Sequence, residues 1–267
     1  MCVLAVVACG QGDTDTTQRN RDVPATVALG GLPEPFSDPS PPPVPPTTVA
    51  PTSVVPSTPA VSEAVAGEIA DLVVGYRVLL IGDTVLSRTA PRNDGTMCDV
   101  LADFGWTVEV DAEPGRFIEF GGEVLDQRLE PADGEPWDVV GLMLGHHFDG
   151  DIDGFVRQLG ELLDRLSPRP ILLYTVSELD ADAIAINEVI RASPRSRPNV
   201  VVIDWAEVTA LDPDRMFEDE GPDLSRQGGE VLVLHTASAL GRTPRSESGA
   251  RGACLPTAFV DDSAILL

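Results

Sequence analysis

From about residue 76 onward, hydrophobic and polar positions alternate between two patterns. Short continuous apolar runs, such as RVLLIG at 77–82 and WDVVGLML at 137–144, are typical of strands buried on both faces of a parallel sheet. Between such runs lie segments with apolar residues every three or four positions, as at 155–166, which is the spacing of an amphipathic helix. This alternation predicts an α/β domain whose parallel sheet is covered by helices on both faces.

The pattern predicts a three-layer α/β/α domain with a five-stranded parallel sheet. Ser225 is a plausible N-cap for the last helix, and Gly241 is its expected end. Functional groups should gather at the carboxyl ends of the strands. The expected strands are 77–82, 106–111, 137–144, 170–175 and 199–203, and the expected helices are 62–72, a segment ending near 104, 119–128, 155–166, 181–191 and 225–240.

The region before the domain has a different composition. Nine of the 21 residues from 39 to 59 are proline, which fixes φ and removes a backbone donor, so this stretch should be an extended linker. The chain therefore divides into a signal-like start at 1–9, a Pro/Thr/Ser-rich disordered linker at 10–60, the α/β domain at 61–241 and a tail at 242–267.

The first nine residues form an apolar run that ends in small residues, as the tail of a signal peptide does. Val6-Val7-Ala8-Cys9 resembles the lipobox of bacterial lipoproteins, in which the cysteine is lipidated. No basic residue precedes the run, so we expect the true start to lie upstream. We expect an exported protein that is lipid-anchored through Cys9 to the outer face of the cell membrane, or secreted.

The strongly negative net charge of the chain disfavours anionic partners. The 43 acidic and 18 basic residues give a formal net charge of −25, which repels phosphate backbones and anionic lipids. Nucleic-acid binding is therefore disfavoured, and contact with a membrane is expected only through the lipid anchor. The charge otherwise serves solubility or favours cationic partners. We expect a monomer.

Four short segments, which include Gly82-Asp83-Thr84 and Gly145-His146-His147, lie after predicted strands or just before the last predicted helix. Their order along the chain resembles that of the SGNH/GDSL hydrolase superfamily, in its secreted actinobacterial branch. That family has Gly-Asp-Ser after its first strand, a glycine after the second, Gly-x-Asn after the third, and Asp-x-x-His before its last helix. The matching segments here are Gly82-Asp83-Thr84, Gly115 (with Gly121-Gly122 as the alternative), Gly145-His146-His147 and Glu220-Gly221-Pro222-Asp223. The resemblance implies a flavodoxin-like fold over about residues 76–241.

The resemblance also assigns roles, and several of these positions carry other residues. Thr84 stands at the serine position, His147 at the oxyanion asparagine, Glu220 at the aspartate and Asp223 at the histidine. A carboxylate is a poor base for a hydroxyl proton, so the family's chemistry should be impaired. The remaining predicted pocket residues are Asp83, Gly115 and Gly145.

The resemblance implies an esterase-like protein that needs no cofactor and no metal. Its expected function is that of a cell-envelope binding module for an acylated small molecule or a cell-wall glycan. The alternative is an active ester hydrolase or acyl transferase that uses Thr84 with His147.

Two further features, a pair of cysteines and a short acidic motif, can each be interpreted in two ways. Export leaves Cys98 and Cys254 as the available partners for a disulfide, although two unrelated thiols remain possible. Asp149, Asp151 and Asp153 imitate the start of a calcium loop, but its twelfth position is Gly160. Acidic residues at a helix start are the plainer interpretation.

Overall fold

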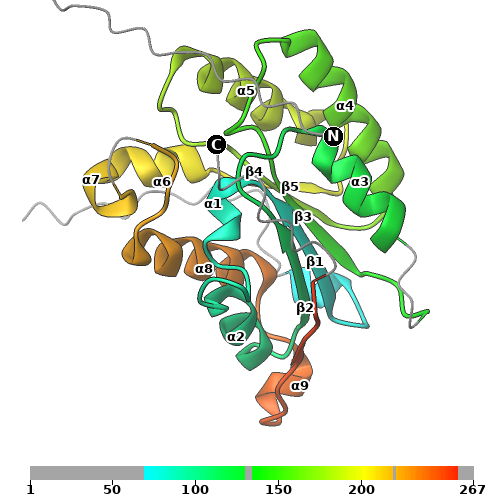
Figure 1. The fold of residues 1–267 in the computed structure, drawn as a ribbon. Helices are drawn as coiled ribbons and strands as arrows, with labels where there is room; N and C mark the ends of the chain where they lie inside the picture. Colours follow the sequence, from blue (N-terminus) through cyan, green and yellow to red (C-terminus); the bar gives the residue numbers. More distant parts are fainter. Residues whose placement is uncertain (1–68, 130–133, 219–220, 258–267) are drawn as a thin grey trace, which may run out of the picture. The chain divides into compact units, whose positions relative to one another are not determined.

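The computed structural model of the chain describes residues 69–129, 134–218 and 221–257. In these residues a six-stranded parallel sheet has the order β5-β4-β3-β1-β2-β6 and lies between two layers of helices (Figure 1). The strands are β1 (Arg77–Gly82), β2 (Thr107–Ala112), β3 (Val139–Met143), β4 (Ile171–Tyr174), β5 (Val200–Ile203) and β6 (Ala253–Cys254). The predicted three-layer α/β architecture is confirmed.

The helices alternate with the strands along the chain, and short helices are added after β5 and between α8 and β6. They are α1 (Thr84–Ser87), α2 (Thr96–Asp103), α3 (Glu119–Arg128), α4 (Ile152–Leu166), α5 (Ala181–Ala192), α6 (Trp205–Leu211), α7 (Pro213–Met216), α8 (Arg226–Leu240) and α9 (Pro244–Glu247), with 3₁₀ turns η1 (Ile69–Leu72) and η2 (Ser193–Arg195). Ser225 caps α8 by accepting the Gly228 amide hydrogen, as the sequence predicts.

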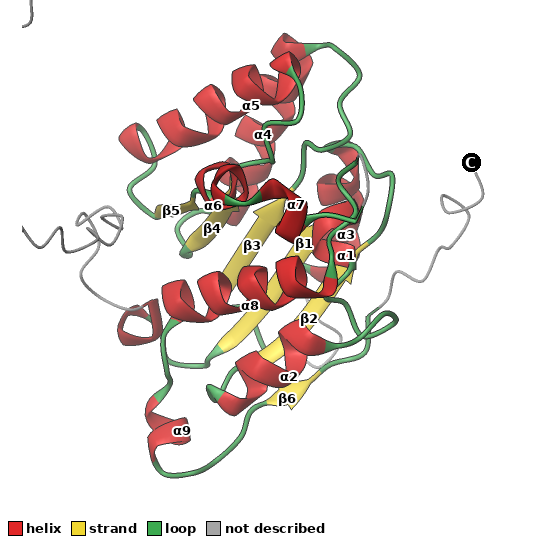
Figure 2. Cartoon of the chain, turned by 90° about the vertical axis from the view of Figure 1, so that its left-hand side faces the viewer, coloured by secondary structure: helices red, strands yellow, loops and turns green. Residues whose placement is uncertain are grey.

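Alternation along β1 explains the two layers. All six residues of β1 are buried, and successive side chains of a strand point to opposite faces. Val78 and Leu80 pack in the cluster that includes residues of α2 and α8, which cross one face of the sheet (Figure 2). Leu79 and Ile81 pack in the other cluster, with α3, α4 and α5. Both faces of β1 are therefore buried under helices. Its pairing with β2 and β3 places the carboxyl ends of the three strands side by side.

The predicted strand number is wrong by one. β6 comes from the segment predicted as a tail, and it pairs with β2 at the sheet edge. Its two residues carry no apolar run, so periodicity could not reveal it. Backbone hydrogen bonds hold the segment, including Leu255 N–H to the Val108 carbonyl at 2.8 Å.

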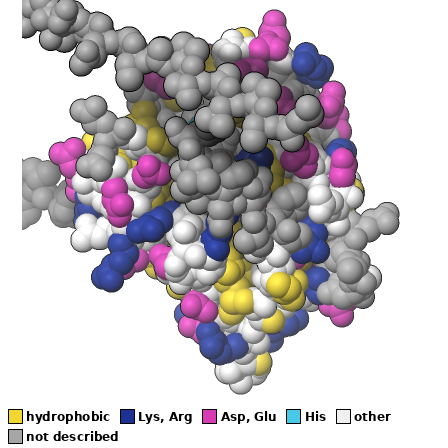
Figure 3. All heavy atoms as spheres, viewed as in Figure 1, with side chains coloured by type: hydrophobic (Ala, Val, Ile, Leu, Met, Phe, Trp, Pro, Cys, Tyr) yellow, Lys and Arg dark blue, Asp and Glu magenta, His cyan; other side chains and the backbone are white. Residues whose placement is uncertain are grey.

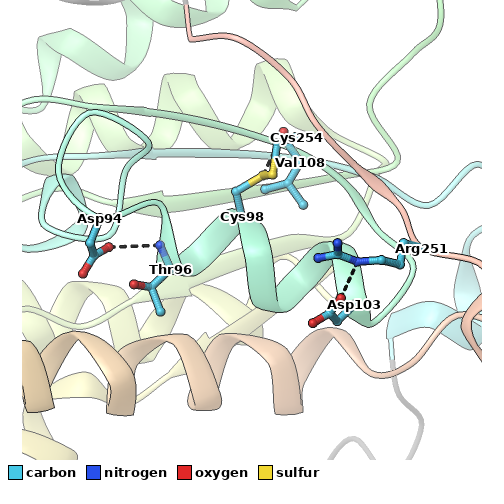
Figure 4. The surroundings of a disulfide bond; sticks show 7 residues. All are labelled: Asp94, Thr96, Cys98, Asp103, Val108, Arg251 and Cys254. Atoms are coloured by element: carbon cyan, nitrogen blue, oxygen red, sulfur yellow. Dashed lines mark hydrogen bonds and ion pairs between the residues drawn. A yellow bond between two sulfur atoms is a disulfide. The ribbon is translucent and has the colours of Figure 1, made fainter.

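A disulfide joins Cys98 of α2 to Cys254 of β6, with Cα atoms 5.7 Å apart (Figure 4). Cys98 is buried on the helix's inner side. Asp103 of α2 also forms an ion pair with Arg251, two residues before β6, so α2 is joined twice to the segment that contains the last strand.

No helix within the described ranges is long and apolar enough to cross a membrane. On the face seen in Figure 3, acidic and basic side chains are interspersed around the visible rim. Cys9, the linker 10–60 and Glu220 lie outside the described residues.

Candidate functional site

The predicted site residues come from the ends of three adjacent strands. β1 lies between β2 and β3, so the segments that follow these strands meet at one edge of the sheet. Asp83 and Thr84 follow β1, Gly115 follows β2, and residues 145–147 follow β3. The register pairs Gly82 with both Ala112 and Met143, which brings the three segments level.

Asp83 organises this edge. It is fully buried, and its carboxylate caps α1 by accepting the Val85 amide hydrogen at 3.3 Å. The same carboxylate accepts the amide hydrogens of Gly145 at 3.1 Å and His146 at 3.0 Å. Gly145 has φ +128°, a conformation that favours glycine, and this lets the chain turn back toward β1. One side chain therefore fixes the loops after β1 and β3 to each other.

Thr84, His147 and Gly115 meet in the candidate site. The Thr84 Oγ1 lies 2.7 Å from His147 Nε2 and accepts the Gly115 amide hydrogen at 3.0 Å. Thr84 and His147 are both partly exposed, so a ligand can reach them. Of the two glycine sites offered by the sequence, Gly115 is the one beside Thr84, because Gly121 and Gly122 lie within α3.

Asp223, which stands at the histidine position of the SGNH/GDSL family, does not join this pair. Asp223 is exposed, and in the described part of the chain no hydrogen bond joins its carboxylate to Thr84 or His147. Its loop is closed instead by backbone pairing, with the Glu218 amide hydrogen donated to the Asp223 carbonyl at 2.8 Å. His235, the remaining histidine, is exposed on α8.

Solved structures share the fold of this domain. TesA aligns with a TM-score of 0.50 at 17% identity, covering 61% of this chain and 97% of that one. The chain has the SGNH/GDSL-hydrolase fold. Identity this low establishes the fold alone.

Other structures with the SGNH fold align at lower scores. The C-terminal catalytic domain of Streptococcus pneumoniae peptidoglycan O-acetyltransferase A has a TM-score of 0.46 at 15% identity, covering 67% of this chain and 97% of that one. The Clostridium thermocellum family 3 carbohydrate esterase has a TM-score of 0.49 at 14% identity, covering 61% and 93%. No protein-family model and no curated protein matches the chain.

A shallow recess adjoins His147 on the α3 and α4 side of this SGNH-fold site. It encloses about 20 Å³, which is room for about one water molecule. Aromatic and acidic side chains line it, among them Phe117, Phe148, Phe155, Glu119 and Asp149. The lining includes no Arg, so the recess suits a neutral or cationic group better than an anion.

The acidic motif at 149–153 has a structural role. Asp151 caps α4 by accepting the Gly154 amide hydrogen at 2.9 Å, and Asp149 accepts the Asp151 amide hydrogen at 2.9 Å. The carboxylate of Asp153 lies in the first turn, where it opposes the positive end of the helix dipole. Helix α4 therefore begins at Ile152, three residues before its apolar periodicity starts.

Sequence reasoning missed His146 and Ser177. The His146 ring is buried between Asp83 and the Ser177 backbone, and Ser177 follows β4, a strand to which no family block was assigned. Two consecutive histidines at a strand end were the available signal. They carry different roles, since His146 faces inward and His147 faces Thr84.

Proposed function

We propose that the protein is a slow ester hydrolase or acyl transferase in which Thr84 is the nucleophile and His147 the general base. The 2.7 Å contact between Thr84 Oγ1 and His147 Nε2 carries this proposal. It is the nucleophile–base spacing that such catalysis requires. The sequence favoured an impaired module, whereas this geometry supports the alternative.

The reaction follows from the groups around Thr84. His147 Nε2 takes the hydroxyl proton as Thr84 Oγ1 attacks the ester carbonyl carbon. The Gly115 amide hydrogen, which Thr84 Oγ1 accepts in the free site, would turn to the resulting oxyanion, together with the Thr84 amide hydrogen at the start of α1. The protonated imidazole then gives its proton to the departing alcohol, which leaves an acyl-threonine. Water, or a second alcohol in a transferase, removes the acyl group by the same steps.

Two features make this enzyme slow. In the described residues no carboxylate reaches His147 Nδ1, so the imidazole lacks the partner that orients and stabilises it in a triad. Losing that partner in serine proteases lowers kcat by about 10⁴-fold. The β-methyl of Thr84 also restricts χ1 beside the attacking oxygen.

A non-catalytic binding module is the second candidate. It is favoured by Asp223, an exposed carboxylate at the position where the family has its histidine base. In this form the site would hold an acylated small molecule or a cell-wall glycan without cleaving it, with at most a water-sized group of the ligand in the recess beside His147.

The deciding experiment measures hydrolysis of p-nitrophenyl acetate and its short-chain homologues. Turnover should disappear in both Thr84→Ala and His147→Ala and persist in His235→Ala, which removes an exposed histidine from α8. Thr84→Ser should retain or raise the rate, because it keeps the hydroxyl and removes the methyl group. Turnover unaffected by Thr84→Ala would refute the proposal, and saturable ligand binding without turnover would favour the binding module.

We also propose that the protein works outside the cytoplasm, anchored through Cys9. The Cys98–Cys254 disulfide supports this, because such bonds persist in oxidising compartments. The native product should partition into detergent and incorporate a palmitate analogue. Equal labelling of a Cys9→Ser variant would exclude the anchor.

A further inference from the structure

His146 is buried beside the reacting pair and takes no part in the proposed chemistry. Its side chain is 2% exposed. Nδ1 lies 3.1 and 3.2 Å from the two Asp83 oxygens, and Nε2 lies 3.1 Å from the Ser177 backbone nitrogen. The ring therefore spans from the end of β1 to the end of β4.

These contacts determine where the ring proton lies. A backbone N–H only donates, so His146 Nε2 must accept from Ser177 and carries no proton. The proton of the neutral ring is then on Nδ1, where it is donated to the Asp83 carboxylate. The opposite tautomer would set two donors against each other at Ser177 and leave two acceptors facing each other at Asp83.

The position of His146 links this ring to the reacting pair. His147 is the next residue, and its Nε2 must come within hydrogen-bond reach of Thr84 Oγ1. The backbone before it is held by Asp83 through the Gly145 and His146 amide hydrogens. The His146 ring adds a third attachment to Asp83. Its other nitrogen accepts the Ser177 amide hydrogen, which ties the loop to the segment after β4.

We propose that His146 is a positioning residue: locked as the Nδ1–H tautomer between Asp83 and the Ser177 amide, it holds the loop so that His147 faces Thr84. The catalytic consequence rests on the proposed function, while the tautomer and the loop position do not. A displacement of about 1 Å in a reacting group can lower a rate by about 100-fold.

The first test is ¹⁵N NMR of the imidazole nitrogens at neutral pH. The chain has three histidines, so single substitutions assign every signal. We expect a protonated Nδ1 and an unprotonated, hydrogen-bonded Nε2 for His146. A protonated Nε2 on His146 would overturn the proposal, and this signal can be assigned with His147→Ala and His235→Ala, in which His146 is unchanged.

The second test separates the two halves of the contact. His146→Asn places an amide donor near the Nδ1 position and can keep the Asp83 bond, whereas His146→Gln places an acceptor near the Nε2 position and can keep the Ser177 bond. His146→Phe keeps the ring volume and removes both bonds. We expect kcat to fall about 100-fold in His146→Phe and less in the other two, with KM nearly unchanged.

The His147 signals give a readout that does not need turnover. In His146→Phe they should move toward those of exposed His235, because the Thr84 hydrogen bond is lost. The matched control, His235→Phe, should leave the His147 signals unchanged. A His146→Phe protein with a lower melting temperature but unaltered His147 signals would show a merely structural role and refute the proposal. A wild-type protein without turnover would refute the proposed function alone, since both NMR tests would still stand.

Discussion

A buried acid pair on β2 should make stability fall as pH rises. Glu109 and Asp111 lie two residues apart on one face of the strand, and both are buried. Burial, together with the negative charge of Asp111, raises the pKa of Glu109 from 4.5 to about 8. Arg128 partly opposes this, with its Nε 2.7 Å from a Glu109 oxygen. At neutral pH the folded protein therefore favours the protonated carboxyl group of Glu109.

The sign follows from comparing folded and unfolded states. The pKa of Glu109 is higher in the folded state, so its stabilising effect is complete below about pH 4.5 and is lost as pH rises to about 8. Each pKa unit corresponds to about 1.4 kcal/mol, which gives a ceiling of about 5 kcal/mol. Because Arg128 favours the charged form of Glu109 and so opposes the shift, we expect a loss on the order of 2–4 kcal/mol.

The assay is urea unfolding of the wild type and of Glu109→Gln between about pH 5 and about pH 9. The wild-type free energy of unfolding should decline across this range, and the decline should be much smaller in Glu109→Gln. Any contribution of His235 cancels in the difference because both proteins contain it. Glu123→Gln removes an exposed carboxylate from α3 and should behave as wild type. Parallel curves for wild type and Glu109→Gln would refute the reasoning.

Three further outcomes are expected. Replacing Cys98 and Cys254 together by Ala should lower the free energy of unfolding by up to about 5 kcal/mol, measured in denaturant, because the bond closes a loop with a sequence separation of 156. Gly145→Ala should lower the free energy of unfolding by about 1–3 kcal/mol, measured by thermal unfolding, since φ is +128° and an added Cβ would lie 3.2 Å from Val176 Cγ1. Asp149→Asn should lower any preference for a choline ester over an uncharged ester about threefold in competition assays, whereas Asp99→Asn on α2 should not.

The strands and long helices were predictable because their signals are local. β1 and β3 are continuous apolar runs, and α3 has the bounds 119–128 that the sequence predicts. β6 was not predictable, since two residues carry no period and their pairing depends on contacts with β2, some 146 residues earlier. The short helices α6 and α7 likewise fall below the length at which periodicity is informative.

For the site, motif order placed Asp83, Thr84, Gly115 and Gly145 at one edge of the sheet, where the structure has them. The sequence offered His147 either as a replaced oxyanion group or as a base, and only geometry could distinguish these roles. The Thr84 contact is set by how the loop after β3 turns, which the motif does not encode.

The two-residue strand β6 has a consequence for self-association. Without it, β2 would present unpaired N–H and C=O groups along a sheet edge, the arrangement that templates pairing between molecules. β6 covers Thr107 and Val108 at the start of β2, and Leu255 continues the backbone contact there. Because Cys254 ties this cover to α2, reduction should expose the edge while the central strands remain folded. A reducing environment should therefore promote edge-to-edge aggregation before it causes global unfolding.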